Sequence, residues 1–145
     1  MVKHICVPVD NSDYSNRAID LAVELGRTCG AKLTGIHVYA ARLHDYRFKQ
    51  MEYTLPEEYK DEQELERQRK IHDSLIAMGL QLISESYLDV MARKAQAAGL
   101  PFDRKMVDGK HYKVLIDDCA ASDYDLVVMG ALGMGAVKDS QLGSV

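Results

Sequence analysis

The 145-residue chain has few cysteines, and the three present are far apart. Cys6, Cys29 and Cys119 are odd in number and form no C-x-x-C pair, which gives little support to a disulfide framework or a zinc site. Cys6 falls in an apolar segment, and Cys29 and Cys119 fall in helical patterns. We therefore expect buried thiols and a reducing, cytoplasmic location.

Several other features are missing. No apolar run approaches the roughly 20 residues that a bilayer span needs. The first residues, 1–5, lead directly into a strand-like pattern and leave no room for a signal peptide. The net charge of −4 disfavours nucleic acid as the main partner. Hydrophobic residues make up 47% of the chain, so we expect one packed domain, without a membrane or a nucleic-acid partner.

The first forty residues have the pattern of a strand, a helix and a second strand. Residues 4–9 are apolar and end at Asp10, with Pro8 near the strand end, where no ladder hydrogen bond is needed. Asn11, Ser12 and Asp13 favour a helix start, and Gly30 favours its end. Residues 32–39 form the second strand of a predicted right-handed βαβ unit.

An insertion follows, over about residues 40–70. It is charged, it carries Tyr46, Tyr53 and Tyr59, and we expect a connection with some helix. From residue 57 to 98 the pattern is helical, with one apolar stripe made of Ile71, Leu75, Met78 and Leu82. One straight helix of this span would be about 60 Å long, against a radius of gyration of about 15 Å for a compact domain of this size. The helix must therefore break, with Gly79 as a candidate, or project toward a partner.

The last third returns to alternating strands and helices. Residues 102–107 form a short polar strand that we place near an edge of the sheet, and residues 114–119 lie on a third helix. Leu126–Met129 is an apolar run typical of a buried strand. The order predicts one α/β domain over residues 1–145, an open parallel sheet of four strands wrapped by helices.

Ligands of such sheets bind beyond the carboxyl ends of the strands. Asp10 could accept hydrogen bonds from ribose hydroxyls, or it could cap the following helix. Gly130 and Gly133 could bring backbone N–H groups close to phosphate, or form only a tight turn. Ser144 could bind phosphate or begin a helix, and Lys138 could screen phosphate charge or be merely solvated.

Taken together, these segments resemble a known family. The pattern Gly130-x2-Gly133-x9-Gly143-Ser144 is similar to the nucleotide-binding signature of universal stress proteins. The opening segment 5–15 and the segments 35–39 and 125–130 also resemble that family. The resemblance implies a flavodoxin-like or Rossmann-like fold and membership of the subgroup that binds ATP.

The resemblance also implies roles for particular residues. Pro8, Val9 and Asp10 would line the adenosine, with Asp10 on the ribose, and the backbone of Val38 would meet the adenine edge. The remaining implied contacts wrap the ribose and hold the phosphates, and they involve Met129, Gly130, Gly133, Gly143, Ser144 and Val145. Magnesium or manganese would be carried on the phosphates, because no carboxylate cluster suggests a metal site made by the protein alone.

The sequence departs from the family pattern after the signature. The family continues with one more helix and a fifth strand, which usually makes a homodimer, whereas this sequence stops at Val145. We therefore expect a piece of a longer protein, or a second domain that supplies the missing strand. The phosphate side of the site should then be less supported than the adenosine side.

Three functions are compatible with the sequence. The first is an ATP-binding regulatory module whose nucleotide occupancy changes its protein contacts. The second is an interaction scaffold that needs no nucleotide, suggested by the tyrosine-bearing insertion and the long helix. The third is a slow ATPase, with His111 as the histidine nearest the nucleotide. Because no Walker-type lysine–serine pair occurs, we expect no enzyme activity beyond weak ATP hydrolysis.

Overall fold

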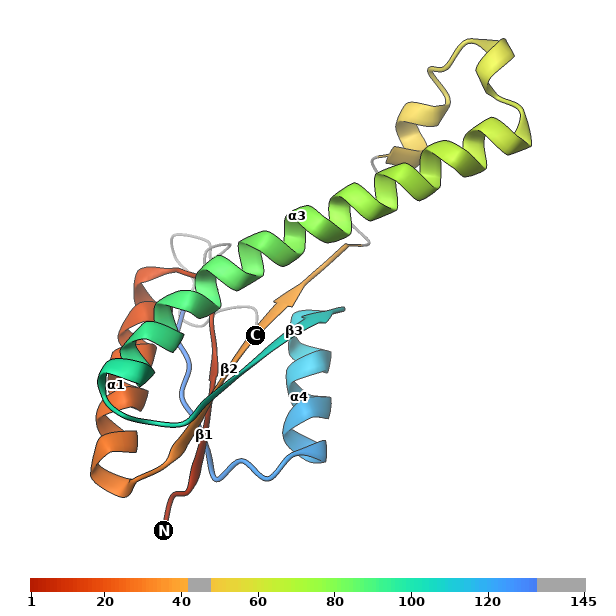
Figure 1. Ribbon diagram of the computed structural model, residues 1–145. Coiled ribbons are helices and arrows are strands. Elements are labelled where there is room, and N and C mark those ends of the chain that lie inside the picture. Colours follow the sequence, from red (N-terminus) through yellow and green to blue (C-terminus); the bar gives the residue numbers. More distant parts are fainter. Residues whose placement is uncertain (42–47, 133–145) are drawn as a thin grey trace.

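The computed structural model describes residues 1–41 and 48–132, which form one open parallel sheet with helices on both faces (Figure 1). The strand order is β3-β2-β1-β4, and every neighbouring pair is parallel. This confirms the predicted fold class and places the polar strand 102–107 at an edge. The elements in chain order are β1 (His4–Pro8), α1 (Asp13–Cys29), β2 (Lys32–Tyr39), the 3-10 turn η1 (Glu57–Tyr59), α3 (Glu62–Ala97), β3 (Phe102–Asp108), α4 (His111–Ala121) and β4 (Leu126–Val127).

The two faces of the sheet carry separate cores. Ile5, Val7 and Leu33 point toward α1 and α3, where Ile19 and Leu88 are buried with them. The alternate positions of the same strands point toward α4, whose Leu115 packs with Cys6, Ile36 and Val38. This alternation is the two-residue period of a strand covered on both faces. As a result β1, which lies between β2 and β4, is almost fully removed from water.

Helix α3 packs on the sheet only near its carboxyl end. Its buried residues are Ser84, Leu88, Met91 and Ala95. The helix can approach closely because β2 has a glycine at the contact: a Cβ on Gly35 would lie 2.9 Å from Leu88 Cδ2 and 3.0 Å from Met91 Sδ. Only about a third of the helix is therefore part of the folded core.

The rest of α3 projects from the sheet (Figure 1). The helix is continuous over 36 residues, so it is about 54 Å long at 1.5 Å per residue. The predicted break at Gly79 is wrong, because α3 runs through this residue, and a helix tolerates one glycine at a cost of about 1 kcal/mol. The other predicted outcome, projection, is the observed one. We call its projecting part, residues 62–83, the arm.

The described part of the predicted insertion is fastened to the arm. Arg69 donates two hydrogen bonds to Glu52, at 2.7 and 2.9 Å, and the ring of Phe48 stacks on His72 with centroids 4.0 Å apart. Residues 48–52 are therefore held against one side of the arm, which we call its inner side.

The cysteine prediction is only partly right. Cys6 is buried, Cys29 is partly exposed and Cys119 is exposed. Among the described helices, α3 alone has the length and composition of a membrane span, yet its carboxyl-terminal third packs on β2 and β3 as a core helix does.

Candidate functional site

The strand order creates a natural ligand position. From β1 the chain moves outward through β2 to β3, and then returns to the other side of β1 as β4. The carboxyl ends of β1 and β4 therefore form the switch point at which open α/β sheets bind ligands. The structure brings together there the predicted residues Pro8, Val9 and Asp10 from β1 and Met129 and Gly130 from β4.

A tight loop joins β1 to α1. Val9 N donates to Ile36 O at 2.9 Å, so pairing with β2 extends one residue beyond the strand. Asp10 N donates to Ser15 Oγ at 3.1 Å, and Asp10 Oδ1 accepts from Ser12 N at 2.9 Å. Ser12 is the helix cap, since its hydroxyl accepts from Ser15 N at 3.1 Å. Asp10 is thus not the cap itself. Its carboxylate closes the turn before the cap and is held at the strand end.

The chain that leaves β4 lies against the start of α1. A Cβ on Gly130 would be 2.8 Å from Tyr14 Cβ and 2.9 Å from Ser15 N. No other residue fits at this distance from a backbone, so Gly130 is required for a close approach between two segments. The approach sets the β4 exit beside the first turn of α1, where unpaired N–H groups and the helix dipole favour an anion.

The residues predicted to line the adenosine differ in how far they are exposed to solvent. Val9 and Val38 are buried, at 4% and 7% exposure. Pro8 and Asp10 are partly exposed, and Met129 is 41% exposed. The backbone role that the resemblance implies for Val38 stays a prediction.

A partly buried histidine, His37, lies at the same edge. His37 Nδ1 is 2.7 Å from Ser84 Oγ, and Ser84 Oγ donates its only proton to Leu80 O at 2.8 Å. Nδ1 of His37 must therefore be the donor, which leaves the lone pair on Nε2. The ring also contacts Tyr87 edge-on, with centroids 5.0 Å apart. The sequence offered one signal for this group, a histidine within an apolar strand, but no pattern pointed to Ser84.

The surroundings of His37 favour the neutral form of its imidazole. Burial lowers the pKa of His37 from its ordinary value of 6.5, the charge of His111 lowers it further, and Asp10 opposes both. His111 begins α4 and Asp10 follows β1. His37, His111 and Asp10 therefore interact electrostatically at this edge. A neutral imidazole beside a carboxylate suits ligand contacts better than charge neutralisation of phosphate.

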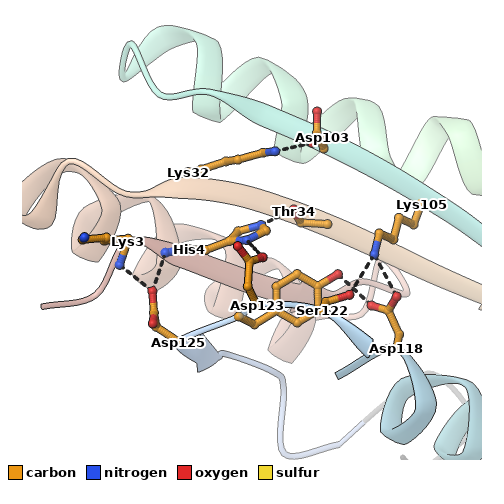
Figure 2. Close-up of polar contacts among 11 residues, drawn as sticks. Lys3, His4, Lys32, Thr34, Asp103, Lys105, Asp118, Ser122, Asp123 and Asp125 are labelled. Carbon is orange, nitrogen blue, oxygen red and sulfur yellow. Dashed lines mark hydrogen bonds and ion pairs between the residues drawn. The ribbon is translucent and has the colours of Figure 1, made fainter. Parts of the chain in front are cut away.

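A polar network fixes β4 from the opposite end of the sheet (Figure 2). Asp125 Oδ2 accepts from Lys3 N at 2.7 Å and from His4 N at 2.9 Å, and these bonds lower the pKa of Asp125. The imidazole of His4 bridges Asp123, at 3.0 Å, and Thr34, at 2.7 Å. These contacts hold the two-residue strand β4 in register with β1, and thereby position Gly130.

The same network ties α4 to β3. Asp118 accepts from Lys105 Nζ at 2.8 Å and from Tyr124 Oη at 2.7 Å. Burial works to raise the pKa of Asp118, but the two hydrogen bonds outweigh it and lower the pKa. Burial also raises the pKa of Tyr124 to about 12, so its hydroxyl stays a donor. The network lies at the amino ends of the strands and is structural.

The remaining predicted residues lie outside the described part of the chain. These are Gly133, Lys138, Gly143, Ser144 and Val145. The predicted weakness of the phosphate side therefore stays a prediction. Within residues 1–41 and 48–132, no group of three or more histidine, cysteine or acidic side chains is arranged to hold a metal ion.

Replacing the packed glycine tests the approach of β4 to α1. The Gly130→Ala variant is expected to lower the free energy of unfolding by about 1 to 3 kcal/mol, because its Cβ would meet backbone atoms. Gly79→Ala is the matched control: nothing lies within 4 Å of its added Cβ, and a gain of about 1 kcal/mol is expected. Urea unfolding measures both. Equal effects of the two substitutions would contradict the close approach.

Acid titration tests the state of His37. Its folded-state pKa lies below 6.5, so the unfolded chain binds the proton more readily. The contribution to stability is fully present above about pH 6.5 and is lost as the pH falls toward the folded-state pKa. The free energy of unfolding of His37→Gln is expected to depend less on pH than that of wild type between about pH 7 and 5. Identical slopes would contradict a lowered pKa of His37.

Comparison with known proteins supplies an independent result. The model of the universal stress protein family matches residues 1–145. The universal stress protein YxiE of Bacillus subtilis is 24% identical over 145 residues, which is all of this chain and 89% of that protein.

Solved structures share the fold. UspA from Lactobacillus plantarum superposes with a TM-score of 0.64 at 21% identity, over 99% of this chain and 86% of that chain. A universal stress protein in complex with cAMP gives 0.56 at 20% identity, over 94% and 78%. A family protein from Arabidopsis thaliana with AMP bound gives 0.58 at 16% identity, over 94% and 81%. Since the family model spans every residue, this chain belongs to the universal stress protein family.

Proposed function

We propose that this protein is an ATP-binding regulatory module, in which nucleotide occupancy modulates stress-response interactions with other proteins. One observation carries the proposal: Gly130 lies against the first turn of α1, beside the loop that holds Asp10, at the switch point of the sheet. Two family structures contain adenine nucleotides, AMP in one and cAMP in the other. Both the geometry and the family therefore support a nucleotide at this edge.

Different residues would contact the ribose, the adenine and the phosphates. Asp10 would accept hydrogen bonds from the ribose, because Ser12 N already orients its carboxylate at the strand end. Pro8 and Val9 would line the adenosine, and the backbone of Val38 would meet the adenine edge. Met129, which is 41% exposed, would contact the ribose and phosphates. The phosphates would be held after β4, with the metal, magnesium or manganese, carried on them. The contacts proposed for the phosphate side involve Gly130, Gly133, Gly143, Ser144 and Val145.

We propose binding without efficient catalysis. Hydrolysis of ATP needs a group that positions the attacking water and groups that stabilise the developing charge. The sequence has no Walker-type lysine–serine pair, and His111 is the histidine that could serve at the start of α4. We therefore propose at most weak ATP hydrolysis, in a cytoplasmic protein that acts as a homodimer or together with a second domain of the same protein.

Calorimetry on matched carboxylate variants tests the proposal. The full chain is titrated with Mg²⁺-ATP and with AMP, and Asp10→Asn is compared with Asp13→Asn. The asparagine oxygen can still accept from Ser12 N, so the loop is kept while the charge is lost. Asp13 is exposed in the first turn of α1. The Asp13→Asn substitution therefore removes the same charge close to the site and serves as the control. We expect Asp10→Asn to bind about 10- to 100-fold more weakly, the equivalent of a lost charged hydrogen bond, and Asp13→Asn to match wild type.

Two results would overturn this function. If wild type gives no heat of binding with Mg²⁺-ATP or with AMP, the proposed binding site is wrong. If Asp10→Asn and Asp13→Asn bind with equal affinity, the proposed role of Asp10 is wrong. Phosphate release measured on the same samples addresses the enzyme alternative. A turnover near about 1 per second that is lost in His111→Ala would show an ATPase instead.

A further inference from the structure

The outer side of the arm carries an apolar stripe that no described residue covers. Its members are Ile71, Leu75, Met78 and Leu82, and each is more than half exposed, from 51% at Ile71 to 66% at Leu82. The inner side of the arm is different, since residues 48–52 are fastened to it through Arg69 and His72. Large apolar side chains grouped on one exposed helix face mark an interaction surface.

The spacing of the stripe identifies the kind of partner. Its residues follow one another at intervals of four, three and four, which is the pattern of the two core positions of a coiled coil. The pattern is the same when read from either end. A second copy of α3 that runs antiparallel would therefore pair Ile71 with Leu82 and Leu75 with Met78, and the pairs would repeat about a two-fold axis.

The charges favour this direction. In the antiparallel pairing, the turn that holds Arg67 and Lys70 lies alongside the turn that holds Glu85 of the second copy. Arg67 and Lys70, whose side chains are exposed, pair within their own helix with Glu64 at 3.6 Å and Glu66 at 3.3 Å, and pairs of exposed side chains contribute little. A parallel pairing would instead set each of these charges beside its own copy, which is unfavourable.

The residues that flank the stripe do not oppose close contact. Ser74, Gly79 and Gln81 stand next to it and carry no charge. The carboxyl-terminal third of α3 is held on the sheet and the arm projects away from it (Figure 1). An antiparallel pair would therefore place the two α/β domains at opposite ends. Only the arms and the outer side of α3 need to meet.

We propose that the stripe is a self-association surface, on which the arm of a second copy of this chain packs antiparallel. The stripe spans about 16 Å of helix, so the surface that the contact buries is expected to be smaller than the roughly 800 Å² per partner of a stable complex. The dimer should therefore be reversible, with a dissociation constant in roughly the micromolar range. The proposal rests on α3 alone and stands whether or not the protein binds nucleotide.

Sedimentation velocity over about 5 to 500 µM protein tests the surface. Wild type is expected to shift from monomer to dimer within this range, and Leu75→Glu and Met78→Glu are expected to stay monomeric. Ile116→Glu is the control, because Ile116 is 65% exposed on α4, away from the arm. It should associate as wild type does. All variants retain the buried residues of α3, and circular dichroism checks their folding.

Cysteine pairing tests the direction in a Cys119→Ser background, which removes the exposed native thiol. A mixture of Leu75→Cys and Met78→Cys chains is expected to form the mixed disulfide, whereas each variant alone should cross-link poorly. Homodisulfides from each variant alone would show a parallel pair and overturn the proposed packing.

Two other outcomes would overturn the surface itself. One is a monomer throughout the range, or a dimer that persists in Leu75→Glu. The other is a monomer that floats with phosphatidylcholine–phosphatidylglycerol vesicles and loses this binding in Leu75→Glu, which would assign the stripe to a lipid surface.

Discussion

The structure depends on the burial of β1 between two parallel neighbours. Ile5 and Val7 face one core and Cys6 faces the other, and their exposed fractions are 0%, 0% and 1%. At about 25 cal/mol for each Å² of apolar surface removed from water, such central residues contribute more than edge residues can. Both neighbours of β1 take their register from it, since β2 pairs along five residues and β4 along two. The position of the candidate site follows, because the switch point is the carboxyl end of this strand.

The short pairing of β4 explains why polar contacts cluster at its start. Only two residues of β4 pair with β1 in the described sheet, so the strand has few backbone hydrogen bonds. The carboxylate of Asp125, which accepts hydrogen bonds from the backbone of Lys3 and His4, adds to the contact between β4 and β1. At the other end Gly130 fits against Tyr14 and Ser15. The strand is thus fixed at one end by hydrogen bonds and at the other by close packing. This arrangement couples the proposed phosphate side of the site to the start of α1. A nucleotide bound there would contact the segment that packs against α1.

Local patterns predicted much of the fold. The alternating strands and helices, the polar edge strand and Asp10 at the tip of β1 all follow from periodicity and turn residues within short windows. The continuity of α3 did not, because Gly79 costs the helix little when apolar and charged helix formers continue on both sides. Cys119 lies on the exposed side of its helix. The position of one cysteine in a helical pattern does not determine which side of the helix it occupies. The roles of Gly130 and His37 depend on Tyr14 and Ser84, which are far away in the sequence, and only the packed structure brings these pairs together.

Hydrogen exchange with and without AMP tests the central claim most directly, that the carboxyl ends of β1 and β4 bind nucleotide. Amide protons of the loop after β1 and of the segment that contains Gly130 lie at this edge, whereas the amino-terminal half of the arm lies far from the sheet (Figure 1). Slower exchange is expected in peptides that cover residues 8–16 and 127–132, and unchanged exchange in peptides from residues 62–72. Protection confined to the arm, or no protection at a saturating concentration of nucleotide, would contradict this claim.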